Sequence, residues 1–194
     1  MANLDQAPSR TMPNLLHVLP AFANESEHRV NTIVELNSNT INKYELITET
    51  GHLKLDRVGY SSLAYPFAYG CLPRTWDEDG DPLDIEIVNV TEPLVPGSIV
   101  EARIIGIMTF DDGGEVDDKV IGVIADDKRM DHIKSFEQLG KHWIKETTYY
   151  WEHYKDLKKP GTCTVNGFFG VEKAVEIIKS CEKRYLSEID PNLI

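Results

Sequence analysis

The sequence contains few cysteines and no long apolar run. Its three cysteines, Cys71, Cys163 and Cys181, are widely spaced and form no C-x-x-C pair, which argues against a zinc site or a redox motif. Nowhere do about 18 apolar residues follow one another, the length that a membrane-spanning helix needs. The first residues also lack the basic leader and apolar stretch of a signal peptide. We therefore expect a soluble, cytoplasmic protein with three small buried thiols.

Positive charge is scarce as well. The chain has 20 basic and 32 acidic residues, a formal net charge of -12, and no run of lysine or arginine. This balance argues against nucleic acid or an anionic membrane as a partner. The 194 residues, 41% hydrophobic, suffice for one globular domain with a sizeable core. We expect that domain at residues 29–194, after a loosely ordered arm, rich in Pro, Asn and Ala, at residues 1–28.

Short β-prone runs separated by turn residues dominate the first two thirds of the chain. No long helical pattern interrupts them, which favours an antiparallel sheet closing into a barrel over a parallel βαβ arrangement. The expected strands lie at residues 30–36, 43–47, 52–58, 83–90, 98–110 and 119–125. Residues three or four apart then predict two C-terminal helices, at residues 142–157 and 171–186. The stripe of the first consists of Trp143, Thr147, Tyr150, Tyr154 and Leu157. The sequence thus indicates a mainly β (α+β) barrel with two flanking helices.

The stretch "DEDGDPLDIEI" at residues 77–87 combines crowded negative charge with the start of a strand. A period of two places Leu83, Ile85 and Ile87 on one face, and Asp84 and Glu86 on the other. This alternation predicts that the acidic side chains stay out of the apolar core.

Three carboxylates of that stretch, those of Asp79, Asp81 and Asp84, would repel one another without a cation. An EF-hand does not explain them, because Pro82 stands where that loop needs glycine and Val88 where it needs glutamate. Oxygen ligands with no histidine nearby favour Mg²⁺, Mn²⁺ or Ca²⁺ over zinc or copper. The alternative is a solvated turn.

A second acidic cluster, "DDGGEVDDK" at residues 111–119, strengthens the metal interpretation. Two connections at the same end of a barrel can face each other across a pocket and make a multi-metal site. The alternative for this segment is a solvated hairpin tip. The sequence also contains isolated cations, which can be anion ligands or ordinary surface residues. They are Lys43, Arg57, Lys119 and Lys155. Glu35 is a lone carboxylate in an apolar run.

The motif "DGDPLD" at residues 79–84 resembles the signature of the soluble, family I inorganic pyrophosphatases. Around it, in the family's order and at nearly its spacing, come "KYE", "LDR", "YPFAYG", "PLVPGSIVEARIIG", "DDGGEVDDK", "DHIKS" and "WEHYKDL". The similarity covers residues 30–185. It implies an OB-like closed antiparallel β-barrel and hydrolysis of pyrophosphate to two phosphates by direct, in-line attack of water. It also implies Mg²⁺, with Mn²⁺ as a substitute, and a homo-oligomer, a hexamer being favoured over a dimer.

The resemblance also implies roles for individual residues. Asp79, Asp84 and Asp117 match ligands of an activating metal, Asp112 matches a ligand of further metal, and Glu35 matches a group that supports a metal through water. Asp81 is similar to the general base. The phosphate-binding groups and the site tyrosine correspond to Lys43, Arg57, Lys119, Tyr154, Lys155 and Tyr69. One departure is "AYGC" at residues 68–71, where bacterial members commonly have Asn-Tyr-Gly-Tyr.

Two other functions are compatible with such a barrel, since a fold alone does not decide function. One is a non-enzymatic module that binds nucleotide or metal, which would not need Asp81. The other is a hydrolase of organic phosphates, which would need a lipophilic or base-stacking wall beside the phosphate site.

Overall fold

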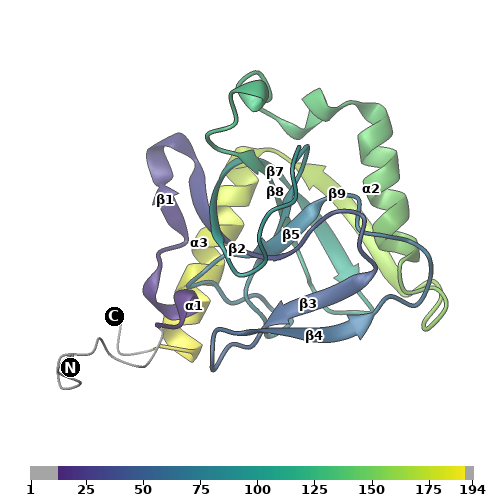
Figure 1. Cartoon of the computed structure of the whole chain (residues 1–194), viewed down its shortest axis with the longest axis horizontal. Helices are drawn as coiled ribbons and strands as arrows, with labels where there is room; N and C mark the ends of the chain where they lie inside the picture. The colour runs from purple at the N-terminus through teal and green to yellow at the C-terminus, as the bar shows by residue number, and fades with distance from the viewer. Residues whose placement is uncertain (1–12, 191–194) are drawn as a thin grey trace, which may run out of the picture.

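The computed structural model describes residues 13–190, in which nine strands and three α-helices form (Figure 1). The strands are β1 (Phe22–Asn24), β2 (Arg29–Leu36), β3 (Asn42–Leu46), β4 (Leu53–Val58), β5 (Ala68–Cys71), β6 (Asp84–Ile87), β7 (Ile99–Asp112), β8 (Lys119–Ile124) and β9 (Cys163–Phe169). The α-helices are α1 (Leu15–Val18), α2 (Lys141–His153) and α3 (Val171–Glu188). Three short 3₁₀ helices lie at Glu25–Glu27, Lys128–Met130 and Phe136–Leu139.

Five strands close into a barrel. They are hydrogen-bonded in the order β2-β5-β6-β8-β7, and β7 pairs with β2 to complete the ring. β1 and β9 extend the sheet at β2 and β7, whereas β3 and β4 form a separate two-stranded hairpin. This arrangement confirms the expected mainly β, OB-like barrel.

The prediction of a purely antiparallel barrel was wrong at one pair of strands. β6 and β8 run parallel, with Asp84 opposite Lys119. The reason is that β8 folds back on β7 as a hairpin and inserts between β7 and β6, so it enters beside β6 in the same direction. This register brings the starts of the two strands side by side, where each of the two acidic segments ends.

All six predicted strands are present, but β1, β5 and β9 were not predicted. β5 lies in a segment rich in tyrosine and glycine, whose composition resembles a loop. Its Gly70 is required by close packing, because a Cβ atom there would lie 2.1 Å from the carbonyl oxygen of Ile33 in β2.

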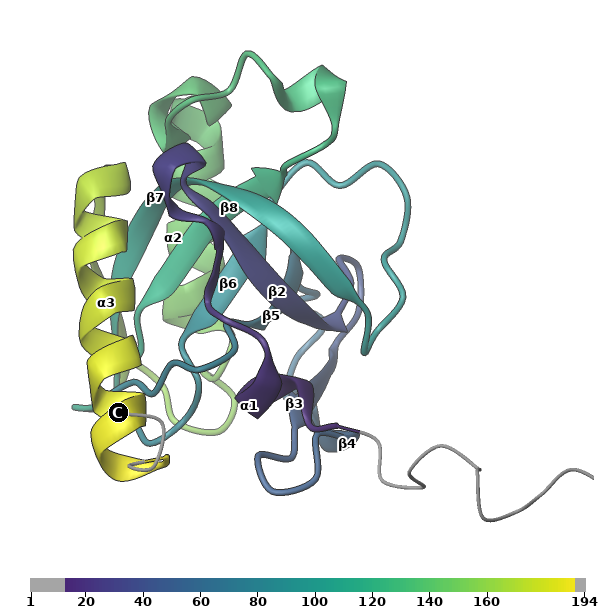
Figure 2. The same ribbon diagram turned by 90° about the vertical axis from the view of Figure 1, so that its left-hand side faces the viewer.

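The two helices predicted near the C-terminus cover different parts of the barrel (Figures 1 and 2). α3 packs on β7, and its predicted stripe is buried through Ala174, Ile178, Cys181 and Tyr185. α2 packs beside β9 and ends at His153, so the prediction of a helix to residue 157 was wrong. Leu157, placed in the stripe of α2 by its spacing, is 75% exposed.

The alternation along β6 separates two buried regions. Leu83, Ile85 and Ile87 are fully buried under α3, as predicted. The opposite face carries Glu86, which is hydrogen-bonded to Trp151 of α2 and is also fully buried. The expectation that the acids stay out of the core was therefore wrong for Glu86, because both faces of this strand are covered.

The N-terminal segment is packed on the barrel from residue 13 onward. Asn14 caps α1 by accepting a hydrogen bond from the Leu16 N–H at 3.1 Å, and Leu16 and Ala21 are fully buried. Residues 13–28 thus differ from the loosely ordered arm that their composition suggests, whereas residues 1–12 lie outside the described part. The three cysteine thiols are free and buried, as expected. Within residues 13–190, no helix has the length and apolarity needed to cross a membrane.

Candidate active site

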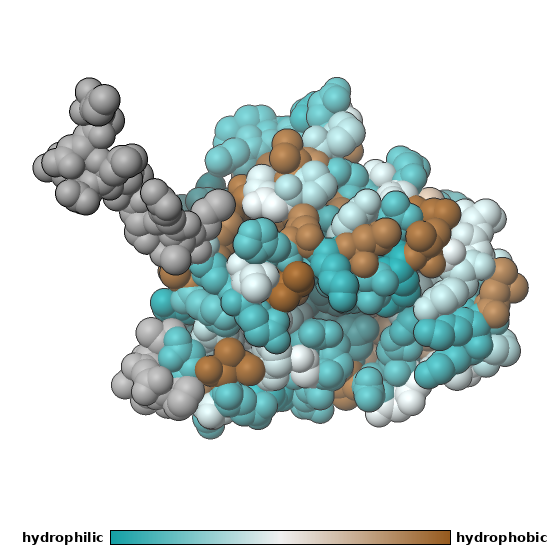
Figure 3. All heavy atoms as spheres, turned by 60° about the horizontal axis from the view of Figure 1, so that its bottom comes forward, coloured by the Kyte–Doolittle hydropathy of each residue, from teal (hydrophilic) through white to brown (hydrophobic). Residues whose placement is uncertain are grey.

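A cavity of about 240 Å³ opens between the barrel and the β3–β4 hairpin. Eleven of the twelve residues singled out from the sequence line it; the twelfth, Lys119, lies behind the carboxylates of Asp84 and Asp117. Figure 3 shows the end of the molecule nearest this hairpin as mainly hydrophilic, with hydrophobic residues in small groups. The lining also includes Glu45, Tyr65 and Trp151, which the sequence did not single out.

The two acidic loops meet through a residue that the sequence left without a role. Asp77 accepts a hydrogen bond from the Asp118 N–H at 3.3 Å and is 5% exposed. Within the first loop, the Asp77 N–H donates to the Asp81 carbonyl at 2.7 Å, and the Asp81 N–H donates to Asp79 Oδ1 at 3.1 Å. Gly80 between them has a φ of +89°, which glycine adopts without strain.

Lys119 joins the carboxylates at the start of the two parallel strands. Its Nζ lies 2.8 Å from Asp84 Oδ2 and also forms an ion pair with Asp117. The Tyr69 hydroxyl donates to the same Asp84 oxygen. Burial acts to raise the pKa of Asp84, but Lys119 and Lys43 outweigh it and hold that pKa below its usual value. Asp84 is therefore an anion with fixed donors on both sides.

Among residues 13–190, no lysine or arginine forms an ion pair with Asp79, and the charge of Lys119 acts on it only weakly. Burial, followed by the charge of Asp117, raises the pKa of Asp79 to about 8. Crowded carboxylates of this kind are relieved by a cation, and an all-oxygen set of Asp79, Asp84 and Asp117 suits Mg²⁺ or Mn²⁺. In their present positions no three acidic, histidine or cysteine side chains of residues 13–190 converge as a metal cluster. Lys119 instead pairs with Asp84 and Asp117, so the donor set fits a divalent ion in its chemistry and requires side-chain rotation to bind one.

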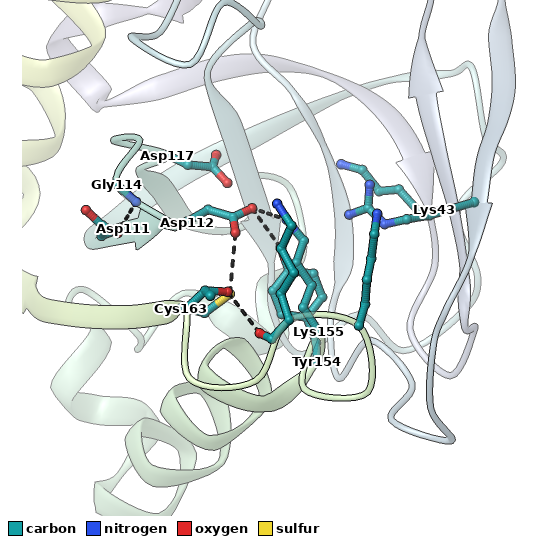
Figure 4. A network of polar contacts seen from close by, with 12 residues as sticks. Lys43, Asp111, Asp112, Gly114, Asp117, Tyr154, Lys155 and Cys163 are labelled. Atoms are coloured by element: carbon teal, nitrogen blue, oxygen red, sulfur yellow. Dashed lines mark hydrogen bonds and ion pairs between the residues drawn. The ribbon is translucent and has the colours of Figure 1, made fainter.

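Asp112 occupies the other side of the cavity (Figure 4). Its Oδ2 accepts from the Tyr154 hydroxyl at 3.2 Å and pairs with Lys155, and its Oδ1 accepts from Cys163 Sγ at 3.4 Å. Burial would raise the pKa of Asp112, but the bond to Lys155 lowers it below its usual value. Tyr154 and Lys155 follow the last turn of α2, which places both beside the second acidic loop.

The hairpin supplies cations from the opposite wall. Lys43 and Arg57 face each other across β3 and β4, and Figure 4 shows Lys43 coming from a different wall than Lys155. Lys43 Nζ lies 3.6 Å from Glu45 Oε1 and 4.7 Å from the centre of the Tyr69 ring. Glu45 follows Lys43 by two residues in a strand, so the period of two could have identified it.

Glu35 ties this hairpin to the barrel. Its Oε1 accepts a hydrogen bond from the Leu46 N–H at 2.8 Å, and the residue is 4% exposed. Burial raises the pKa of Glu35 to about 7, although the charge of Lys43 opposes the shift. Glu35 lines the cavity while its carboxylate holds the end of β3.

A buried pair at the back of the cavity was not foreseen. Trp151 Nε1 donates to Glu86 Oε1 at 2.6 Å, and both side chains are almost completely buried. Burial raises the pKa of Glu86 to about 8. Because the two residues are 65 positions apart, no local pattern could have linked them.

The site combines an OB-like barrel, two joined acidic loops, and lysine, arginine and tyrosine side chains that face these loops. This combination defines a class of proteins that bind cations and anionic oxygens in one cavity. Residues 32–186 match the model of the inorganic pyrophosphatase family. The chain therefore belongs to the inorganic pyrophosphatase family.

Individual relatives agree with this assignment. An inorganic pyrophosphatase of Geobacillus stearothermophilus is 42% identical over 156 residues, 80% of this chain and 93% of the relative. The soluble inorganic pyrophosphatase 3 of Arabidopsis thaliana is 43% identical over 149 residues, 77% of this chain and 68% of the relative.

Solved structures show the same fold. A crystal structure of an inorganic pyrophosphatase from Neisseria gonorrhoeae has a TM-score of 0.84 and 37% identity, covering 88% of this chain and 98% of that one. The inorganic pyrophosphatase from Thermus thermophilus has a TM-score of 0.81 and 36% identity, covering 89% of this chain and 99% of that one.

Proposed function

We propose that this protein is an enzyme that hydrolyses pyrophosphate to two orthophosphates by in-line attack of water, with residues 29–194 as a single catalytic domain. The observation that carries the proposal is the cavity itself, in which two acidic loops tied by Asp77 face Lys43, Arg57 and Lys155. An acidic pocket alone would repel pyrophosphate, and cations alone would not activate water. Membership of the family supports the same reaction.

The proposed metal ligands are Asp79, Asp84 and Asp117, with Asp112 for further metal and Glu35 acting through water. Mg²⁺ is the expected ion and Mn²⁺ a substitute, since the donors are carboxylate oxygens. When bound, the metal would supply positive charge that neutralises phosphate oxygens and lowers the pKa of a water toward about 7.

The chain's own residues carry out the remaining steps. Asp81, an exposed carboxylate at the tip of the first loop, accepts the proton of the attacking water. The oxygen of that water forms a bond to one phosphorus as the bond from the same phosphorus to the bridging oxygen breaks. The second phosphate leaves with the bridging oxygen. No serine, cysteine or histidine nucleophile is needed.

Fixed donors bind the phosphate oxygens. Arg57 can donate two parallel hydrogen bonds, whereas the lysines act as point charges. The proposed set comprises Lys43, Arg57, Tyr69, Lys119, Tyr154 and Lys155. The lysines that now hold Asp84, Asp112 and Asp117 would exchange these carboxylates for phosphate oxygens as the carboxylates turn to metal.

The test is phosphate release from pyrophosphate over a titration of Mg²⁺, with ATP and a phosphomonoester as controls. We expect metal-dependent release from pyrophosphate and much slower release from both controls. Equal rates on ATP would favour an organic-phosphate hydrolase, and no release from any substrate would favour a binding module. A cytoplasmic homo-oligomer, with a hexamer favoured over a dimer, completes the proposal, and sedimentation of the purified protein tests the oligomeric state.

A further inference from the structure

Glu86 is a fully buried carboxylate that the reaction described above does not use. It lies on β6, two residues after Asp84 and on the same face. Its Oε1 accepts the Trp151 N–H, whereas its Oε2 is buried and has no hydrogen-bond partner among the described residues. A carboxylate oxygen without a partner destabilises a fold, and leucine would avoid that cost. The position therefore calls for a functional explanation.

Trp151 connects Glu86 to the cavity. The indole lines the cavity, and Lys119 Nζ lies 5.1 Å from the centre of its ring. The rings of Phe110 and Tyr69 lie 5.7 Å and 5.9 Å from the same ammonium group. These three rings, here called the aromatic cradle, surround an ammonium group that is almost completely buried, its side chain being 1% exposed.

The ionic partners of Lys119 are the groups proposed to bind metal. In the structure its ammonium group contacts Asp84 and Asp117. When those carboxylates turn to a metal, the aromatic cradle remains as the fixed surroundings of Lys119. Donation of the indole N–H to a carboxyl oxygen leaves more negative charge on the ring face, which strengthens the attraction of the ring for an ammonium group.

We propose that Glu86 is a positioning residue, which acts through Trp151 to hold Lys119 where it binds a phosphate group of the substrate. The inference rests on the proposed function, since it assigns the contact of Lys119 with phosphate to that reaction. It predicts an effect on phosphate affinity that exceeds any effect on the chemical step.

The test compares Glu86→Leu, Trp151→Phe, their double variant and Glu86→Gln. Each single apolar change leaves a buried polar partner unpaired and lowers the melting temperature. The double variant removes both partners, so its melting temperature returns toward that of the wild type. The KM of the double variant for pyrophosphate should still be about tenfold higher than that of the wild type, because Lys119 lacks the polarised ring. Its kcat should differ from the wild-type value by less than about threefold. Wild-type KM in the double variant would show a purely structural pair and overturn the proposal.

Two measurements independent of turnover complete the test. Calorimetry with inorganic phosphate and Mg²⁺ should give about tenfold weaker binding to the double variant. In ¹⁵N-labelled protein, the resonance of the Trp151 indole N–H should move upfield in Glu86→Leu, which removes its acceptor. In Glu86→Gln the shift should be smaller, because the amide oxygen still accepts the hydrogen bond, and the KM should stay within about threefold of the wild type. An indole resonance that Glu86→Leu leaves unmoved, or unchanged phosphate affinity, would contradict the proposal.

A matched control is Trp143→Phe, the same change on the same helix. Trp143 packs edge-on against Phe168, 5.8 Å between ring centres, and does not line the cavity. Its KM and phosphate affinity should equal those of the wild type. Failure of the wild-type protein to hydrolyse pyrophosphate would contradict the proposed function, whereas an active wild type with unaffected variants would contradict only the role of Glu86.

Discussion

The carboxylate of Asp77 accepts a hydrogen bond from the backbone N–H of Asp118, 3.3 Å away, and thereby joins two acidic loops that are 41 residues apart. Asp77 Oδ1 is also within 3.5 Å of the Cys181 thiol and 3.6 Å of Arg184 in α3. Asp77, which does not line the cavity, thus fixes the position of the two loops relative to each other.

Replacing Asp77 with alanine should therefore loosen the two loops together. We expect a loss of about 1–3 kcal/mol in the free energy of unfolding, because a buried donor loses its partner, and weaker Mg²⁺ binding. Denaturant unfolding and calorimetry measure the two effects. Glu78→Ala is the control, since Glu78 contacts the same Arg184 with a side chain that is 58% exposed. Equal effects of the two changes would contradict the role of Asp77.

Asp81→Asn tests the proposed general base. Asp81 is exposed and contributes its backbone to the loop, so an isosteric amide should leave the melting temperature nearly unchanged. Turnover of pyrophosphate should fall roughly 10²-fold or more, the scale of losing a general base, while Mg²⁺ binding is retained. Steady-state kinetics at saturating Mg²⁺ check this, and wild-type turnover would rule out the role.

Leu16→Ala tests whether the N-terminal segment belongs to the core. Leu16 is fully buried in a cluster with Ile33, Leu46 and Cys71, of which the last two line the cavity. The truncation should cost about 2–5 kcal/mol of stability. Val18→Ala, at a side chain in the same helix that is 49% exposed, should be nearly neutral. A loosely attached segment would instead tolerate both changes.

Glu182 in α3 gives a prediction for the dependence of stability on pH. Burial, followed by the charge of Glu25, raises its pKa above the usual value. The folded state therefore binds the proton more tightly than the unfolded state, and the ionised form at neutral pH destabilises the fold. Glu182→Gln should raise the melting temperature at pH 7 and raise it less at pH 4, where the folded state holds the proton and the unfolded state holds most of it. Glu176→Gln, on the exposed side of α3, should show no such gain at pH 7.

The parts of the fold that the sequence predicts are those whose signals are local. Alternation located β6 and the apolar face that packs under α3, and helical spacing located α3 almost to the residue. The parallel contact of β6 with β8, the hydrogen bond between Asp77 and Asp118, and the pair of Glu86 with Trp151 join residues far apart in the chain. Such contacts depend on strand order, which neither periodicity nor composition encodes.

For the candidate site, the family motifs brought together the residues with recognisable chemistry, and the structure places eleven of the twelve around one cavity. The residues that the motifs could not identify, Trp151 and Glu86, form a buried pair next to the cavity. Trp151 belongs to a helix whose stripe was drawn through its neighbour Tyr150, and Glu86 seemed to face away from the core. Their importance depends on packing, which becomes visible only when α2 lies against the barrel.

Two cations of the cavity belong to a different sheet from the carboxylates that are proposed to bind metal. The barrel carries Asp84 and Asp117, the hairpin carries Lys43 and Arg57, and the bond from Leu46 to Glu35 spans the boundary. Part of the positive charge thus lies on a separate sheet, which the buried hydrogen bond from Leu46 to Glu35 ties to the barrel. Under the proposed function, substitutions of Lys43 or Arg57 would change the affinity for the anionic substrate and leave the proposed metal ligands Asp84 and Asp117 in place.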